Sequence, residues 1–153
     1  MKKLVTANSG RSYHGKTSSL KKVIGELLDN KATEIPGTRE GDHNNKDADE
    51  RVILDYKGIL IGIETQGDPG SRLFSSLKDF VEKECEIIVC ARRTSGNTYE
   101  EVMNLKKQHG YEIIWYSNPY VESIEEGELP DKVKAVYAKS VREMIEKRIS
   151  GEI

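Results

Sequence analysis

GRSYHGKTSSLKK, residues 10–22, lies between a short apolar run and an amphipathic one. Gly10, Gly15, Lys16 and Thr17 match the pattern G-x-x-x-x-G-K-[ST] without a gap. In that pattern the glycines let successive backbone N–H groups point inward, and the helix that follows directs its positive end to the same place. We therefore expect an anion-binding loop, in which Lys16 reaches the β- and γ-phosphates of a nucleotide and Thr17 binds Mg²⁺. The other nucleotide contacts expected in this loop are Ser12, Tyr13, His14 and Ser18.

The residues on either side of this loop supply the strand and the helix that the pattern requires. Residues 4–8 predict a short strand. Residues 16–29 predict an amphipathic helix, because apolar residues recur at the spacing of one helix face. These apolar residues are Leu20, Val23, Ile24, Leu27 and Leu28.

Strands and helices alternate along the rest of the chain, which is typical of the α/β class. Residues 52–56 and 59–65 predict a β-hairpin around a Lys57-Gly58 turn, so two neighbouring strands are antiparallel. The remaining predicted elements are helices at 71–84, from 97 to a stop at Gly110, and at 131–149, with strands at 86–91 and 111–116. A capping box of Thr98 and Glu101 is expected at the start of the second of these helices. We expect one domain over residues 1–153, a three-layer α/β/α sandwich of about five strands, mostly parallel with one antiparallel edge strand.

Residues 30–50 lack hydrophobic periodicity and are rich in Gly, Asn, Asp and Glu. Segments of this length without regular structure are usually functional or disordered, so the pattern predicts a long mobile loop. Thr33 and Thr38 are candidates for a threonine that joins Mg²⁺ when a triphosphate binds.

The loop at residues 10–17 and the elements around it resemble the P-loop nucleoside triphosphate hydrolase superfamily, and the element order is similar to that of Ras-like small GTPases. The resemblance implies a P-loop NTPase fold, with the second hairpin strand beside the strand of the phosphate loop. In that family this second strand ends in Asp-x-x-Gly-Gln, and here it ends in ETQGD. The resemblance implies that Glu64 holds Mg²⁺ through water, that the Gly67 N–H reaches the γ-phosphate, and that Asp68 stands where a water-positioning Gln would be.

The chain departs from the Ras-like pattern at the residues that choose the base and the water. Glu replaces Asp at 64, and Asp replaces Gln at 68. After the last predicted strand the chain reads SNPYVE, where Asn118 is present but the Lys and Asp of a guanine-reading Asn-Lys-x-Asp are missing. We therefore expect ATP by default, or GTP, as the nucleotide, with Mg²⁺ as its metal ion.

Three functions follow from this pattern. The first is a Mg²⁺-dependent NTPase with slow hydrolysis, in which Lys16, Glu64 and Asp68 stabilise charge on the transferred group. The second is a small-molecule kinase whose acceptor binds at the sheet edge, and the third is a non-hydrolysing nucleotide switch or assembly module with a protein partner. Thr17, Glu64 and Asp68 are the expected metal ligands in each case.

Arg92 and Arg93 follow a buried strand at its carboxyl end, where ligands of open α/β sheets bind. Either arginine could contact the base or the phosphates, and the sequence does not separate them. Arg11 and His14 lie inside the phosphate loop, where both side chains could equally point to solvent.

Composition excludes several other classes of protein. The 24 Lys and Arg residues nearly balance the 26 Asp and Glu residues, so bulk charge indicates no nucleic-acid surface. The chain has no apolar run near the roughly 20 residues that span a bilayer, so we expect no membrane contact and a cytoplasmic protein. Cys85 and Cys90 have neither redox nor zinc spacing and are expected to be reduced and partly buried.

Overall fold

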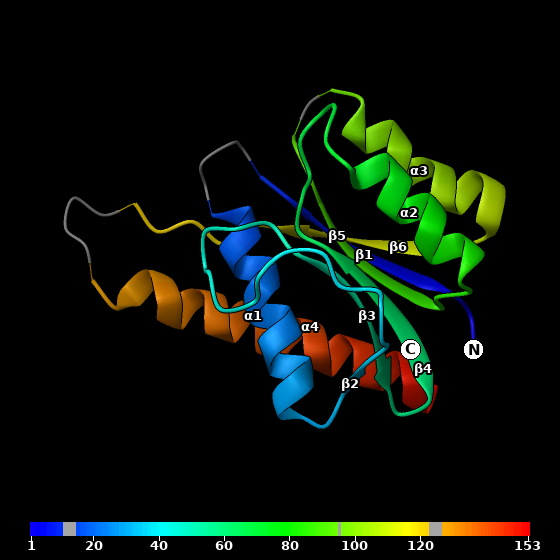
Figure 1. Cartoon of the computed structure of the whole chain (residues 1–153), viewed down its shortest axis with the longest axis horizontal. Coiled ribbons are helices and arrows are strands. Elements are labelled where there is room, and N and C mark those ends of the chain that lie inside the picture. Colours follow the sequence, from blue (N-terminus) through cyan, green and yellow to red (C-terminus); the bar gives the residue numbers. More distant parts are fainter. Residues whose placement is uncertain (11–14, 95, 123–126) are drawn as a thin grey trace.

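The computed structural model describes residues 1–10, 15–94, 96–122 and 127–153. Within them, six strands form one mixed sheet in the order β2-β3-β4-β5-β1-β6 (Figure 1). The strands are β1 (Leu4–Ser9), β2 (Thr33–Glu34), β3 (Arg51–Tyr56), β4 (Ile59–Glu64), β5 (Ile87–Arg92) and β6 (Glu112–Ser117). The helices are α1 (Lys16–Asp29), α2 (Leu73–Glu82), α3 (Thr98–His109) and α4 (Leu129–Ser150). No helix in the described part of the chain combines the length and the apolar character needed to cross a membrane.

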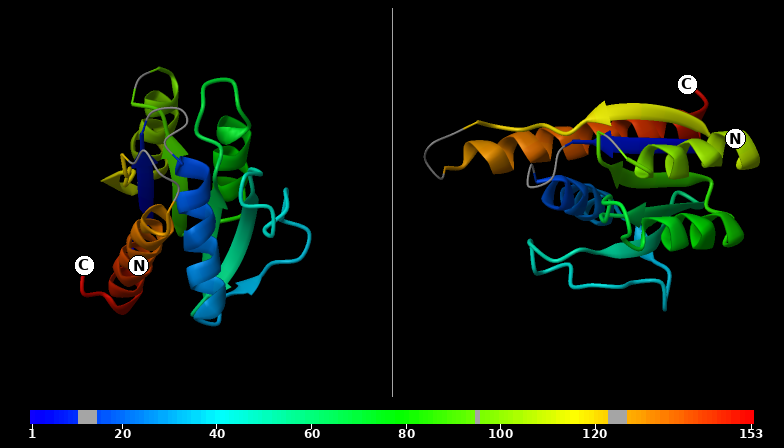
Figure 2. Two further views of the ribbon diagram at one scale, coloured as in Figure 1. Left: turned by 90° about the vertical axis from the view of Figure 1, so that its left-hand side faces the viewer. Right: turned by 90° about the horizontal axis from the view of Figure 1, so that it is seen from above.

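Helices cover both faces of the sheet, so the chain has three layers (Figures 1 and 2). On one face, α1 and α4 pack together over a core that includes Leu20, Leu54 and Val141. On the other face, α2 and α3 pack over a core that includes Phe80 and Ile88. Strands that are buried on both faces consist of continuous apolar runs, which explains the unbroken IIVCA sequence of β5.

The α/β class and the mixed sheet are confirmed, but the edge differs from the prediction. β1 pairs in parallel with β5 and β6, and β5 pairs in parallel with β4. β3 is antiparallel to β4, as the hairpin predicted, and positive φ angles at Lys57 and Gly58 form the turn. The antiparallel strand is not at the edge, however, because β2 pairs with its outer side. β2 was missed because two exposed residues carry no hydrophobic period.

The expected neighbour of β1 is wrong. β4 does not lie beside β1, because β5 lies between them and pairs with both strands. Ile87 is aligned with Leu4 on one side and with Ile61 on the other. A hydrophobic run predicts that a parallel strand is buried but not which strands it pairs with. The carboxyl ends of β1, β4 and β5 still meet at one edge of the sheet, where ligands of such sheets bind.

Helix boundaries follow the sequence closely, with one correction at α3. The predicted capping box is wrong: α3 begins at Thr98 after Asn97, and the Thr98 hydroxyl accepts a hydrogen bond from the Arg93 N–H. Gly110 ends the helix in the left-handed conformation, as predicted. α4 begins one residue before Pro130, which occupies its first turn.

Residues 30–50 contain more structure than the prediction of a loop implies. They include β2 and a bridge between Glu40 and Arg51. From residue 42 to residue 50 the segment runs along α1, where Lys21 donates hydrogen bonds to the Asp42 and Ala48 carbonyls. Whether this segment moves stays a prediction.

Both cysteines are fully buried, and burial raises the pKa of each thiol to about 12. Because the thiolate is the reactive form, we expect iodoacetamide at pH 8 to leave both thiols unmodified in the folded protein. In denaturant both should react within minutes, which mass spectrometry would record. Labelling of either cysteine at the same rate with and without denaturant would contradict the burial described here.

Candidate functional site

The candidate site lies at the carboxyl ends of β1, β4 and β5, at the start of α1. β1 ends at Ser9 and α1 begins at Lys16, so the glycine-lysine pattern connects a central strand to a helix. Gly15 precedes the helix in the left-handed conformation, with φ of 76°. A side chain is strained at this φ. The predicted contacts Ser12, Tyr13 and His14, together with Arg11, lie outside the described residues.

The Lys16 ammonium is turned back over the start of the loop. Its Nζ donates hydrogen bonds to the Gly10 carbonyl at 2.8 Å and to the Arg92 carbonyl at 3.3 Å. The side chain is only 8% exposed, and burial lowers the pKa of the Lys16 ammonium, an effect that the Asp68 carboxylate opposes from 3.9 Å. Lys16 is thus a desolvated cation held at the end of β1 by neutral carbonyls and one exposed carboxylate.

Asp68 and Arg93 meet beside Lys16. Arg93 Nε lies 2.8 Å from Asp68 Oδ1, and about half of each side chain is exposed. They line one cavity of about 430 Å³ at the start of α1. Its described lining residues are Gly15, Lys16, Thr17, Ser18, Lys46, Asp47, Asp68 and Arg93. Lys46 and Asp47 come from the segment before β3 and were not predicted as site residues.

The structure separates the two arginines that the sequence left undecided. Arg93 faces this cavity, whereas the Arg92 guanidinium lies over the ring of Trp115 at 4.7 Å and that of Tyr99 at 5.2 Å. Tyr99 and Trp115 stack on each other, so Arg92 completes a cation–aromatic cluster. Arg92 therefore contributes its carbonyl to Lys16, while its side chain belongs to that cluster.

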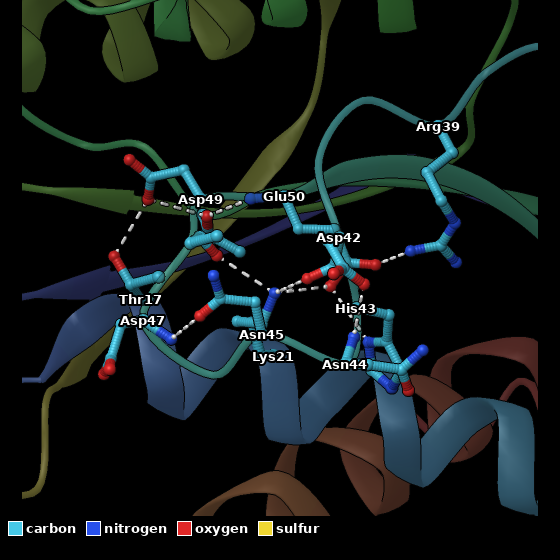
Figure 3. A network of polar contacts seen from close by, with 12 residues as sticks. Thr17, Lys21, Arg39, Asp42, His43, Asn44, Asn45, Asp47, Asp49 and Glu50 are labelled. Atoms are coloured by element: carbon cyan, nitrogen blue, oxygen red, sulfur yellow. Dashed lines mark hydrogen bonds and ion pairs between the residues drawn. The ribbon is translucent and has the colours of Figure 1, made fainter.

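Thr17 contacts a carboxylate that the sequence analysis missed. The Thr17 hydroxyl donates to Asp49 Oδ1 at 2.9 Å, and the Thr65 hydroxyl donates to the same oxygen at 3.0 Å. Figure 3 shows Asp49 reaching Thr17 from the segment that precedes β3. With Lys16 and Asp68, these three residues line a second cavity of about 280 Å³. The predicted hairpin contained a signal for Asp49. Because β3 and β4 are antiparallel, the start of β3 lies at the same sheet edge as the end of β4.

Glu64, predicted as a metal ligand and catalytic residue, is directed elsewhere. It is fully buried, and Arg72 contacts both carboxylate oxygens, at 2.8 and 3.2 Å. The Ser76 hydroxyl and the Gln66 N–H donate to it at 2.5 and 2.9 Å. Glu64 is not among the described residues that line either cavity. Glu64 does end the second hairpin strand, β4, as predicted. A single sequence does not reveal that the Arg72 guanidinium pairs with its carboxylate.

Close packing requires glycine at Gly67 and leaves little space at Gly10. A Cβ at Gly67 would lie 2.7–2.8 Å from atoms of Ala91, including its backbone, so β5 leaves no room for a side chain there. A Cβ at Gly10 would lie 3.0 Å from Asn118 Cβ. Gly67 also lines the smaller cavity, which is compatible with the phosphate contact implied by the resemblance.

Lys134 of α4 is a further cation at this site that sequence reasoning missed. Its Nζ donates to the Ser18 hydroxyl at 2.6 Å, and it would lie 2.8 Å from a Cβ at Gly15. Helical periodicity placed α4 on the sheet but could not place its first turns against the start of α1.

The two switch-threonine candidates and Asn118 serve the scaffold. The Thr38 hydroxyl donates to the Ile35 carbonyl and accepts from the Ile53 N–H, which ties residues 35–38 to β3. Thr33 lies in β2 at the far edge of the sheet. The Asn118 side-chain carbonyl accepts a hydrogen bond from Asn8.

The oxygen donors around Thr17 suit Mg²⁺, which binds few protein ligands and completes its octahedron with phosphate oxygens and water. In the described part of the chain, no three His, Cys, Asp or Glu side chains form a group that would hold a metal ion by themselves. A metal at Thr17 and Asp49 would therefore depend on a bound phosphate.

No protein-family model matches this chain, and neither the curated proteins nor the solved structures contain a match to it.

Proposed function

We propose that this chain binds a purine nucleoside triphosphate with Mg²⁺ at the start of α1 and hydrolyses its γ-phosphoryl group slowly. The observation that carries the proposal is the buried Lys16 ammonium, folded between the Gly10 and Arg92 carbonyls at the end of a central strand. Desolvating a cation is costly, and here the cation is compensated only by two neutral carbonyls and one carboxylate at 3.9 Å. Phosphate oxygens would replace the two carbonyls as acceptors and would compensate the charge of Lys16.

Each neighbouring residue has a role in this function. The first backbone N–H groups of α1 and the dipole of the helix favour an anion at Gly15–Thr17. Arg93 lines the same cavity and would add positive charge beside the transferred group. Bound Mg²⁺ would supply charge neutralisation on the phosphates, with Thr17 as one of its ligands.

Slow turnover is expected because Asp68, the exposed carboxylate of the site, is held between two cations. Arg93 lies 2.8 Å from it and Lys16 lies 3.9 Å from it. Both contacts are made by Oδ1, so this oxygen is engaged by cations rather than presented to an attacking water. Its contacts support a role in positioning Lys16 and Arg93.

An apolar cavity of about 440 Å³ between the end of β6 and α4 supports a place for the base. Pro119, Leu129, Val133 and Val136 are among its lining residues. Lys134, next to Val133 on α4, contacts Ser18 at the start of α1. The cavity therefore adjoins the helix turn that reaches the phosphate site, and its surface suits a purine ring.

A small-molecule kinase is the second candidate. It is favoured by Lys46 and Arg93, which line the larger cavity beyond Thr17 and would bind an anionic acceptor. A phosphorylated metabolite that raises the melting temperature only in the presence of nucleotide would favour this function over hydrolysis.

The test is a melting series with ATP, ADP, GTP and GDP, each with Mg²⁺ and with EDTA, accompanied by a phosphate-release assay. A ligand at 100 times its dissociation constant adds about 2.7 kcal/mol of stability. We expect a Mg²⁺-dependent shift with triphosphates, and the larger shift of ATP or GTP identifies the base. Failure of every nucleotide at millimolar concentration to raise the melting temperature would overturn the proposal. A shift without phosphate release would identify a non-hydrolysing switch.

A further inference from the structure

We propose that Asp49, in the segment before β3, is the carboxylate that binds the Mg²⁺ of the nucleotide together with Thr17, in place of Glu64. This inference rests on the proposed function and names the metal ligand of the same site. It assigns a role to the acidic end of residues 30–50, which the sequence analysis treated as a loop.

The side-chain oxygens of Thr17 and Asp49 lie close enough to bind one metal ion. Thr17 Oγ1 lies 2.9 Å from Asp49 Oδ1. In an octahedral Mg²⁺ site with bonds of about 2.1 Å, neighbouring ligand oxygens lie about 2.9 Å apart. The two oxygens thus have the spacing of adjacent ligands, and a metal bound to both would take the hydroxyl oxygen as a neutral ligand while the hydroxyl proton turns to another acceptor.

Asp49 and Lys16 line the same cavity. Asp49, Thr17 and Thr65 line it on one side, and Gly67 and Asp68 complete it. A metal at Thr17 and Asp49 would therefore lie on the same cavity as the lysine that binds the phosphates, as a metal bridging phosphate oxygens must.

Both carboxylates that the sequence predicted as metal ligands, Glu64 and Asp68, already have cationic partners. Glu64 is fully buried, with Arg72, Ser76 and the Gln66 N–H on its oxygens. Asp68 Oδ1 faces the Arg93 guanidinium and the Lys16 ammonium, two cations that would repel a divalent ion. The contacts of Asp49 Oδ1 are hydroxyl groups, which are themselves ligands for Mg²⁺ or can turn to other acceptors.

Hydrogen bonds hold the backbone on both sides of Asp49 in the absence of a metal. The Glu50 N–H donates to the Thr65 hydroxyl at 2.9 Å, and the Thr65 N–H donates to the Glu50 carbonyl at 3.0 Å. Lys21 of α1 donates to the Ala48 carbonyl and lies 3.2 Å from the fully buried Glu50 carboxylate. Figure 3 shows these contacts converging on residues 42–50 above α1. Asp49 is thereby held in place from both sides.

The test compares Asp49→Asn with Glu64→Gln, two substitutions that remove one negative charge and keep the shape. Titration calorimetry gives the dissociation constant of β,γ-imido ATP with saturating Mg²⁺ and with EDTA, and the ratio of the two constants measures the coupling of metal and nucleotide. For the wild type we expect Mg²⁺ to tighten binding at least tenfold. In Asp49→Asn the ratio should fall below about twofold while binding in EDTA persists, and in Glu64→Gln the wild-type ratio should be retained.

The outcomes separate this inference from the proposed function. The assignment of Asp49 would be overturned if Asp49→Asn kept the wild-type ratio of dissociation constants, or if only Glu64→Gln lost it. Either result would still be compatible with a nucleotide site. Absence of binding of both β,γ-imido ATP and β,γ-imido GTP to the wild type, with Mg²⁺ and with EDTA, would overturn the proposed function and this inference with it. If Asp49→Asn does not fold, Asp49→Ala, which removes both carboxylate oxygens, is measured against the same criteria.

Discussion

Lys16→Ala should remove the nucleotide-dependent rise in melting temperature and lower phosphate release at least about 100-fold. The reason is that Lys16 is the desolvated cation at the end of β1, and mutations of single charge-stabilising donors typically cost factors of this size. Without ligand, the variant should melt close to the wild type, since the removed ammonium contacts two main-chain carbonyls beside a cavity. Melting curves and phosphate release, each with and without Mg²⁺, make the measurement.

The matched control is Lys22→Ala. Lys22 lies on the same helix and is exposed to solvent. It should keep both the nucleotide response and the hydrolysis rate. Equal loss in both variants would indicate a general effect of charge near α1, and an undiminished response in Lys16→Ala would remove the lysine from the phosphate site.

Arg72→Ala should lower the free energy of unfolding by about 3 kcal/mol, the largest stability effect among the polar substitutions considered. It removes the guanidinium from Glu64, which is fully buried, and breaking a buried ion pair from one side leaves an uncompensated charge. Arg72→Ala should also loosen the start of α2, because the Arg72 side chain connects Glu64 at the end of β4 to the first turn of that helix. Urea unfolding followed by circular dichroism gives the value.

Arg93→Ala is the control for a more exposed ion pair. Its Nε lies 2.8 Å from Asp68, the same distance as that between Arg72 Nε and Glu64, but about half of each side chain of this pair is exposed. Exposed pairs contribute about 1 kcal/mol or less. If the two arginine variants lose equal stability, burial is not what distinguishes the pairs.

Much of the scaffold was predictable because it depends on periodicity and on turn residues. The stripe on residues 16–29, the Lys57-Gly58 hairpin and Gly110 all predicted their elements to within a few residues. These features are local, so one sequence contains them. The position of β5 between β1 and β4 depends on pairing between distant segments and was predicted wrongly.

The residues of the candidate site were also predicted only in part. Lys16, Thr17, Gly67 and Asp68 were named from a motif and its distance to the next strand, and all four line one cavity. Glu64 was named by the same analogy and is paired with Arg72 instead.

Other site residues come from parts of the chain that carry no motif. Asp49 and Lys134 reach the site only because an irregular segment and the last helix pack against α1. The hairpin indicated that the start of β3 lies at this sheet edge, but not that Asp49 contacts Thr17. For Lys134 the sequence offers no such indication, because side-chain contacts between distant segments leave no periodic signal.

Lys21 also changes how the segment at residues 42–50 would open. Its ammonium is only 6% exposed and shares its contacts among two carbonyls of the segment and the Glu50 carboxylate. Moving the segment away from α1 would separate the Lys21 ammonium from the Glu50 carboxylate, which are both buried. Exposure of this segment and fraying of α1 are therefore coupled into one cooperative unit, so a ligand that steadies the start of α1 would protect residues 42–50 from amide hydrogen exchange as well.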